Sequence, residues 1–295
     1  MLIMKAVLTT LQMVFLSIPI MGDEVTKSTF EDIKVRAEKG EAVDQLLLGK
    51  LYARGVGVPQ DFKMAAKWFR KSAEQGNADA QYSLGVMFDQ GDGLLEDDKN
   101  AIKWYRKAAK QGNAKAQNNL AIMYNIGRGL EKDTKQSAKF FRKAAEQGHA
   151  YAQYNMGVMY EFGEGVPRSF REAVKWYRKA AERGFAQAQT DLGLLYAMGE
   201  GVPQDFKEAY KWFRIAAERG NAQSQFSLGV MYANGQGVLK NELTAYAWWN
   251  IASASGHAAA KRYKGIITER FSNNEICKAQ ALSREMLKNN PKLLK

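Results

Sequence analysis

The sequence predicts an all-α protein, a solenoid of stacked 36-residue helix-turn-helix repeats, and three periodic features carry that prediction. The first is a glycine that recurs every 36 residues without an insertion, at Gly40, Gly76, Gly112, Gly148, Gly184, Gly220 and Gly256. The second is a glutamine position, at Gln45, Gln81, Gln117, Gln153, Gln189 and Gln225. The third is an aromatic position, at Trp68, Trp104, Phe140, Trp176, Trp212 and Trp248. A fixed internal period of this length is the signature of a repeat architecture, in which each unit buries its apolar face against the next.

Residues 1–22 are predicted to be a cleaved signal peptide. Residues 6–21 carry no charge, but this stretch is shorter than the run of about 20 apolar residues that spans a bilayer comfortably. The charged Lys5, the helix-breaking Pro19 and the small Gly22 are typical of a secretory signal. We therefore expect a periplasmic or secreted protein of a bacterial cell envelope, without a stable membrane span after cleavage. An uncleaved membrane anchor is the alternative.

Capping segments are expected at both ends of the array. Residues 23–40 contain an N-terminal capping helix, with Ser28 and Glu31 at its start. Residues 257–295 contain a partial repeat and a final amphipathic helix, which Ser272 and Glu275 cap. Helices of this kind cover the open ends of a solenoid core.

Six complete repeats lie between the caps, and each predicts two helices. They span residues 41–76, 77–112, 113–148, 149–184, 185–220 and 221–256. In the second copy, Leu84, Met87 and Phe88 lie at helical spacing, and Gly85 allows a neighbouring helix to approach closely. A loop with two glycines leads to a residue whose side chain can cap the second helix. These N-cap residues are Asp61, Asp97, Asp133, Ser169, Asp205 and Asn241. We interpret the aromatic position as core packing between repeats.

Copies such as "NADAQYSLGVMFDQGDGLLEDDKNAIKWYRKAAKQG" resemble the Sel-one-like repeats, which are relatives of the tetratricopeptide repeats. The resemblance covers residues 41–256. It implies a right-handed superhelix with the first helices on the concave side, and a role as an adaptor for other macromolecules. One subfamily with a cysteine pair in each repeat has been linked to penicillin binding and weak β-lactamase activity. This chain has a single cysteine, Cys277, and lacks those pairs.

The residues that carry most enzymatic and metal chemistry are scarce, so we expect neither an enzyme nor a cofactor or metal site. His149 and His257 occupy the same repeat position three repeats apart, where we expect them to be solvated helix-start residues. No serine is followed three residues later by lysine, and no Gly-x-Ser-x-Gly motif, zinc motif or phosphate loop is present. Cys277 is expected to be a small packed side chain of the last helix.

The chain is basic, with 43 Lys and Arg against 31 Asp and Glu and a net charge of +12. The second helices repeat a lysine and an arginine, at Lys67, Lys103, Lys139, Lys175 and Lys211 and at Arg70, Arg106, Arg142, Arg178 and Arg214. We interpret this basic stripe as a solvated outer face. An anionic polymer is the alternative partner, whereas nucleic acid is not favoured because no known nucleic-acid module is present.

Recognition is expected on the first helices, where four positions vary between the copies. Solenoids offer partners an extended concave face, and aromatic side chains are common anchors there. The predicted partner-binding residues are Tyr82, Asp89, Asn118, Asn119, Asn125, Tyr154, Asn155, Glu161, Phe162, Asp191, Met198 and Phe226. The leading hypothesis is an exported, non-catalytic scaffold that binds a protein or peptide, with cell-wall or other envelope components as further possible partners. The alternatives are penicillin binding with weak β-lactamase activity, and anionic-polymer binding through the basic stripe.

Overall fold

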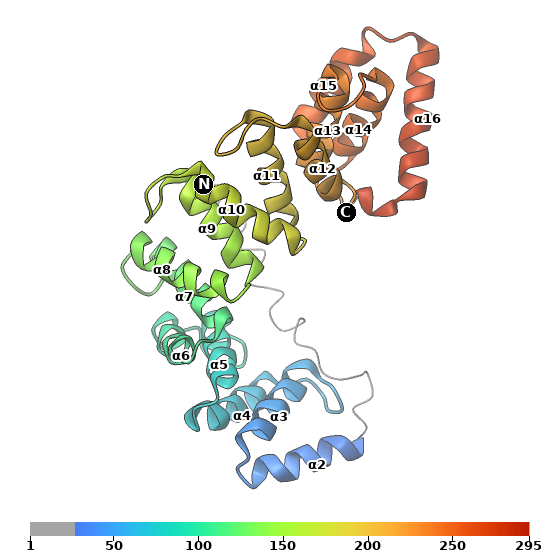
Figure 1. Ribbon diagram of the computed structural model, residues 1–295. Helices are drawn as coiled ribbons and strands as arrows, with labels where there is room; N and C mark the ends of the chain where they lie inside the picture. The colour runs from blue at the N-terminus through green and yellow to red at the C-terminus, as the bar shows by residue number, and fades with distance from the viewer. Residues whose placement is uncertain (1–26, 295) are drawn as a thin grey trace. The chain divides into compact units, whose positions relative to one another are not determined.

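The computed structural model describes residues 27–294, which form fifteen α-helices and one 3-10 helix without a strand among them (Figure 1). The predicted all-α repeat fold is therefore confirmed for this part of the chain. The predicted signal peptide, residues 1–22, lies outside the described residues. No helix within residues 27–294 is both long enough and apolar enough to cross a membrane.

The helices alternate as the period predicts. The first helices of the repeats are α3 Ala42–Arg54, α5 Ala78–Gln90, α7 Ala114–Ile126, α9 Ala150–Phe162, α11 Ala186–Met198 and α13 Ala222–Asn234. The second helices are α4 Phe62–Glu74, α6 Asp98–Lys110, α8 Thr134–Glu146, α10 Phe170–Glu182, α12 Phe206–Ala217 and α14 Glu242–Ala254. The flanking elements are α2 Lys27–Glu38, α15 Ala258–Thr268, α16 Asn273–Asn289 and the 3-10 helix η2 Pro291–Leu294.

The predicted helix caps account for most of these boundaries. Asp61 begins α4 by accepting a hydrogen bond from the Met64 backbone N–H at 2.9 Å, and Ser272 forms a capping box with Glu275. The second helices end at a glycine with positive φ, such as +94° at Gly76. At the other end of the array, α2 already begins at Lys27. Ser28 therefore lies inside this helix, and its expected role as the N-cap is wrong.

The chain divides into two compact units, and the boundary along the chain follows His149. Within each unit, every first helix packs against the second helix of its own repeat, and each second helix packs against the next first helix. In the second unit, α16 and η2 also pack on α14.

The tryptophans of the aromatic position are 5–8% exposed and belong to the core, as predicted, while Phe140 is half-buried. The adjacent aromatic residues are buried still more deeply. Tyr105 is fully buried, and a Cβ atom at Gly85 would lie 2.6 Å from its ring. Five of the six first helices have a glycine at this position, which makes room for an aromatic ring of the second helix, whereas α7 has Ala121.

Candidate functional site

The twelve predicted partner-binding residues differ widely in exposure. Tyr82, Asp89, Asn118 and Asn155 are buried, and Phe162 and Met198 are 63% and 55% exposed. The other six are half-buried, namely Asn119, Asn125, Tyr154, Glu161, Asp191 and Phe226. Several of them belong to two clusters of tyrosines and carboxylates, one in each unit.

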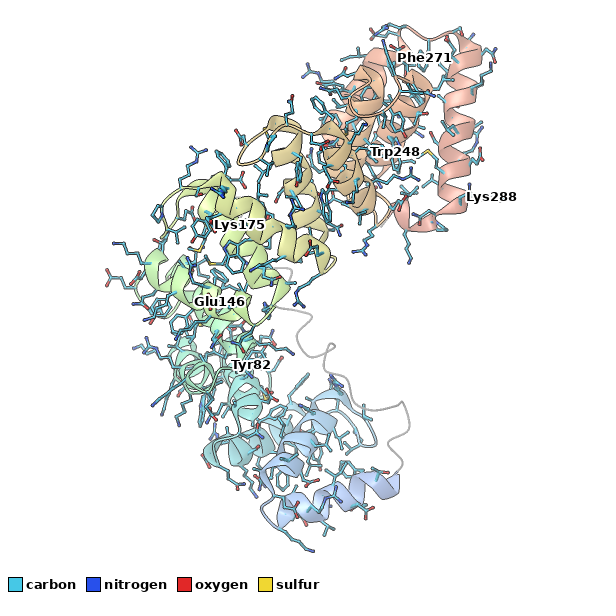
Figure 2. All side chains as sticks on the ribbon, viewed as in Figure 1. Tyr82, Glu146, Lys175, Trp248, Phe271 and Lys288 are labelled. Atoms are coloured by element: carbon cyan, nitrogen blue, oxygen red, sulfur yellow. The ribbon has the colours of Figure 1, made fainter. Side chains whose placement is uncertain are left out.

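The first cluster joins α5, α6 and α7, with Tyr82 labelled on α5 in Figure 2. The Tyr105 hydroxyl donates to Asp89 Oδ2 at 3.0 Å and accepts from Asn119 Nδ2 at 3.0 Å. The Tyr82 and Tyr105 ring centroids are 6.0 Å apart. These bonds satisfy a hydroxyl that has no access to water.

Arg128, in the loop after α7, forms ion pairs with three carboxylates at this cluster. Its Nη1 lies 2.7 Å from Asp89 Oδ1, its Nε lies 2.8 Å from Asp98 Oδ1, and its Nη2 lies 2.8 Å from Glu96 Oε1. Burial raises the pKa of Asp89, and the guanidinium of Arg128 opposes that rise. One arginine therefore stabilises the charge of a carboxylate that is otherwise costly to bury.

The second cluster joins α9, α10 and α11. The Tyr177 hydroxyl donates to Glu161 Oε2 at 2.5 Å, and Gln187 Nε2 donates to Asp191 Oδ1 at 3.0 Å. Burial, with the nearby Glu161 carboxylate, raises the pKa of Asp191 to about 7, although hydrogen bonds from Gln187 and Tyr154 oppose the rise. The Tyr154 ring lies 5.6 Å from that of Tyr177, centroid to centroid.

The two clusters are equivalent, because their members are 72 residues apart: Tyr82 and Tyr154, Asp89 and Glu161, Tyr105 and Tyr177, Asn119 and Asp191. A tyrosine at this place in the second helix needs a hydrogen-bond acceptor 16 residues earlier, where Asp89 and Glu161 stand. The other copies carry Phe69, Phe141, Phe213 and Trp249, and 16 residues earlier Ala53, Asn125, Ala197 and Ala233. Part of the variation between copies, the basis for the predicted recognition surface, therefore reflects the need of a buried tyrosine for an acceptor. The sequence shows this need, because the residue of the first helix and the residue 16 positions later change together from copy to copy.

The clusters differ in their cations. The counterpart of Arg128 is Glu200, and the counterpart of Glu96 is Arg168. Arg168 Nε donates to the Glu161 backbone carbonyl at 2.9 Å rather than to the carboxylate. In the part of the chain that the structure describes, no lysine or arginine forms an ion pair with Glu161 or Asp191. We call the exposed Phe162 and Met198, with Tyr154, Glu161 and Asp191, the α9–α11 site.

The histidines and the cysteine take no part in this site. Both histidines stand at helix starts, as expected, but they are half-buried, so the expectation that they are solvated is wrong. Burial lowers the pKa of His149 to about 4. His257 Nδ1 accepts from the Ala260 backbone N–H at 3.1 Å, so this residue caps α15 at its start. Cys277 is exposed, and the expectation that it is packed is wrong, because its position on α16 faces solvent. Within residues 27–294, no group of three His, Cys, Asp or Glu residues could hold a metal ion.

The basic stripe lies on the outside of the second helices. All five of its lysines are exposed, and its arginines are exposed or half-buried. Arg106 Nη2 donates to the Tyr124 hydroxyl at 2.9 Å, and Arg214 Nε lies 2.8 Å from Glu218 Oε1. This agrees with a solvated face.

Comparison with known proteins identifies the repeats. The Sel1 repeat family model matches residues 42–77, 78–113, 114–149, 150–185, 186–221 and 222–257. A protective antigen present in uropathogenic Escherichia coli strains, with an SLR fold, has a similar structure, with 34% identity over 91% of this chain and a TM-score of 0.81. The match spans 58% of that protein. A Sel1 repeat protein from Oxalobacter formigenes has 37% identity over 81% of this chain and 69% of its own, with a TM-score of 0.70. No curated protein matches the sequence.

Proposed function

The chain belongs to the Sel1 repeat family, whose members are typically protein-interaction scaffolds, and from this premise we propose an exported, non-catalytic scaffold that binds a protein or peptide through its first helices. The binding surface is the α9–α11 site, and the partner brings a cation and an apolar side chain to it.

One observation supports the proposal most directly. Two carboxylates, Glu161 and Asp191, have no ion-pair partner among the described residues, and exposed apolar side chains stand next to them on the same helices. Glu161 and Asp191 lie close enough for one to raise the pKa of the other, and Phe162 and Met198 are more than half exposed. Large exposed apolar side chains next to convergent polar groups are typical of recognition surfaces. The α9–α11 site therefore suits a partner that brings both a cation and an apolar side chain.

The first unit supplies a model for that cation. There the guanidinium of Arg128 lies 2.7 Å from Asp89, the counterpart of Glu161. Charge-assisted bonds between arginine and a carboxylate are short and about twice as strong as neutral ones. We infer that an arginine or lysine of the partner occupies the corresponding place beside Glu161.

Crosslinking in the cell envelope, followed by affinity measurement with the purified partner, tests this proposal. The variant Phe162→Ala/Met198→Ala/Asp191→Asn changes the α9–α11 site without touching the buried Tyr177. We expect it to weaken binding at least about tenfold while the helical circular dichroism signal stays unchanged. The matched control reverses exposed outer charges by Lys139→Glu/Lys175→Glu.

Two outcomes would contradict the proposal. Binding that survives in the α9–α11 variant removes the assigned surface. Loss of binding in the outer-face control, with affinity that falls steeply as salt rises, favours an anionic polymer on the basic stripe instead.

A further inference from the structure

A pocket of about 360 Å³ lies in the second unit, where the end of α10 meets α11 and α12. Its walls include Glu182, Arg183, Gly184, Gln189, Trp212 and Arg219. It contains none of the residues of the α9–α11 site. Its volume is at the small end of the range for ligand pockets, about 300–1,000 Å³, and suits one or two residues of a peptide.

A buried acceptor in this pocket has no partner, because the repeat pattern is interrupted here. In the first three repeats, the glutamine that follows the second helix donates to the glutamine of the first helix. Gln75 Nε2, for example, lies 2.8 Å from Gln45 Oε1 and 2.8 Å from the carbonyl of Gly40. The equivalent bonds are Gln111 to Gln81 at 2.8 Å and Gln147 to Gln117 at 2.7 Å.

In the fourth and fifth repeats an arginine stands at this position, Arg183 and Arg219. Arg219 Nη1 keeps the bond to the preceding glycine, 2.9 Å from the Gly184 carbonyl, but does not donate to Gln189. Gln189 is 2% exposed, and its Oε1 has no hydrogen-bond partner among the described residues. The indole Nε1 of Trp212, a residue that is 7% exposed, is unpaired as well. Gln225 Oε1 and Trp68 Nε1 are also unpaired among the described residues of other repeats, so the missing glutamine-to-glutamine bond, and not these atoms alone, distinguishes this pocket.

The last repeat shows what fills the equivalent place, 36 residues further along. There the chain's own C-terminal segment packs on α14, the helix that carries Trp248 (Figure 2). Gln225 Nε2, the counterpart of Gln189 Nε2, donates to the Leu293 carbonyl at 2.8 Å. Asn290 Nδ2 donates to the Glu218 carbonyl at 2.8 Å, and Leu293 is 2% exposed. A short peptide segment with a leucine is thus an occupant that this type of pocket accepts.

One arginine distinguishes the open pocket from the filled one, because Arg219 stands where the last repeat has Ser255. The other arginine of the open pocket, Arg183, corresponds to Arg219 in the filled place, and its side chain makes no hydrogen bond or ion pair within residues 27–294. Glu182, Arg183 and Arg219 are all exposed, so solvent screens all three charges, and the two guanidinium groups outnumber the one carboxylate. A guanidinium matches the geometry of a carboxylate, whereas the carbonyl of Leu293 needs no cation. The open pocket therefore favours a segment that ends in a free carboxylate.

We propose that the pocket between α10 and α12 binds the C-terminal residue of a peptide. Arg183 and Arg219 hold its carboxylate, and an apolar side chain enters beside Trp212, as Leu293 does one repeat later beside α14. Gln189 Nε2 donates to a backbone carbonyl of the peptide, as Gln225 Nε2 does to Leu293. This site is separate from the α9–α11 site, so either one can bind a ligand without the other.

Isothermal titration of the full chain with N-acetyl-Pro-Lys-Leu, which copies residues 291–293 and ends in a free carboxylate, tests the proposal. We expect binding, and at least about a tenfold loss of affinity when the peptide carries a C-terminal amide. Arg219→Gln installs the residue of the earlier repeats, which donates to Gln189 and closes the pocket. We expect this variant to keep or raise the melting temperature and to bind the free-acid peptide at least about tenfold more weakly.

Two further variants separate this pocket from other sites. Arg183→Gln changes the open pocket but not the groove that residues 290–294 fill, and we expect a similar loss. Arg171→Gln removes an exposed guanidinium from the start of α10, and we expect no change. No binding at millimolar peptide, equal affinity for the amide, or unchanged affinity in both Arg183→Gln and Arg219→Gln would each overturn the proposal.

Discussion

Replacing Glu161 with alanine and Tyr177 with phenylalanine, singly and together, tests whether these two positions change in concert because of one hydrogen bond. Tyr177 is 1% exposed, and its hydroxyl lies 2.5 Å from Glu161 Oε2. In Glu161→Ala this buried hydroxyl loses its acceptor, which costs about 1–3 kcal/mol. Tyr177→Phe costs about 0.5–1.5 kcal/mol, because Glu161 is partly exposed and can turn to water.

The double variant recreates the pair that the next repeat has, Ala197 with Phe213. It leaves no hydroxyl unpaired, so its loss of stability is expected to be about 1–2 kcal/mol smaller than the sum of the two single losses. Urea denaturation of the four proteins at one pH measures this coupling. If the two single losses of stability add up to the loss in the double variant within about 0.5 kcal/mol, the pairing explanation is refuted. Recognition would then be the remaining explanation for the variation at position 161.

Three further predictions concern charge, packing and export. Because the pKa of Asp191 is raised, the folded state keeps a proton on this residue that the unfolded state releases above about pH 4. Asp191 therefore lowers the stability of the fold as the pH rises from about 4 to about 7, by at most roughly 1.4 kcal/mol per pH unit. Asp191→Asn removes this component, and the difference between variant and parent isolates it from His149, whose lowered pKa acts in the opposite direction; parallel stability curves for the two proteins would disprove the assignment. Gly157→Val places a side chain against the Tyr177 ring and is expected to cost at least about 1–3 kcal/mol, so an unchanged denaturation midpoint would contradict the close packing of α9 and α10. A fusion of residues 1–30 to a reporter active only outside the cytoplasm is expected to be active, with a mature N-terminus near Asp23 by mass spectrometry; a chain that keeps Met1 in the cytoplasm would defeat the export proposal.

The architecture could be predicted because each of its determinants is local and repeated six times. A glycine at the end of every second helix and a capping side chain at its start set the helix boundaries within one or two residues. The start of α2 was misplaced because that helix occurs only once, and no other copy fixes its register. The exposure of Cys277 was missed for the same reason, since α16 has no counterpart along the chain.

The candidate site could be predicted only in part. Variation between copies marks Glu161 and Asp191 as positions outside the repeated core. It does not distinguish a residue that is free to vary at the surface from one that varies together with its hydrogen-bond partner in the next helix. The hydrogen bond of Tyr177 gives no sign of itself in the sequence pattern, because its aromatic ring matches Phe69, Phe141 and Phe213 of other copies and differs from them only by its hydroxyl. The bond from Gln225 to Leu293 spans 68 residues and has no periodic signal at all.

The change from glutamine to arginine at position 219 has a consequence for how the array comes apart. Solenoid stability is a sum of the stabilities of the individual repeats and of the coupling between neighbours. In the first three repeats, one glutamine ties the two helices of its own repeat together, and Gln75 and Gln111 also bond the preceding glycine. An arginine replaces this glutamine in both the fourth and the fifth repeats. Arg219 keeps only the tie to the previous repeat, and Arg183 makes neither bond, so both repeats are less firmly closed on themselves. Amide hydrogens of α9 to α12 are therefore expected to exchange with solvent sooner than those of α5 and α6, which would make these two repeats a place where unfolding begins inside the array rather than at its ends.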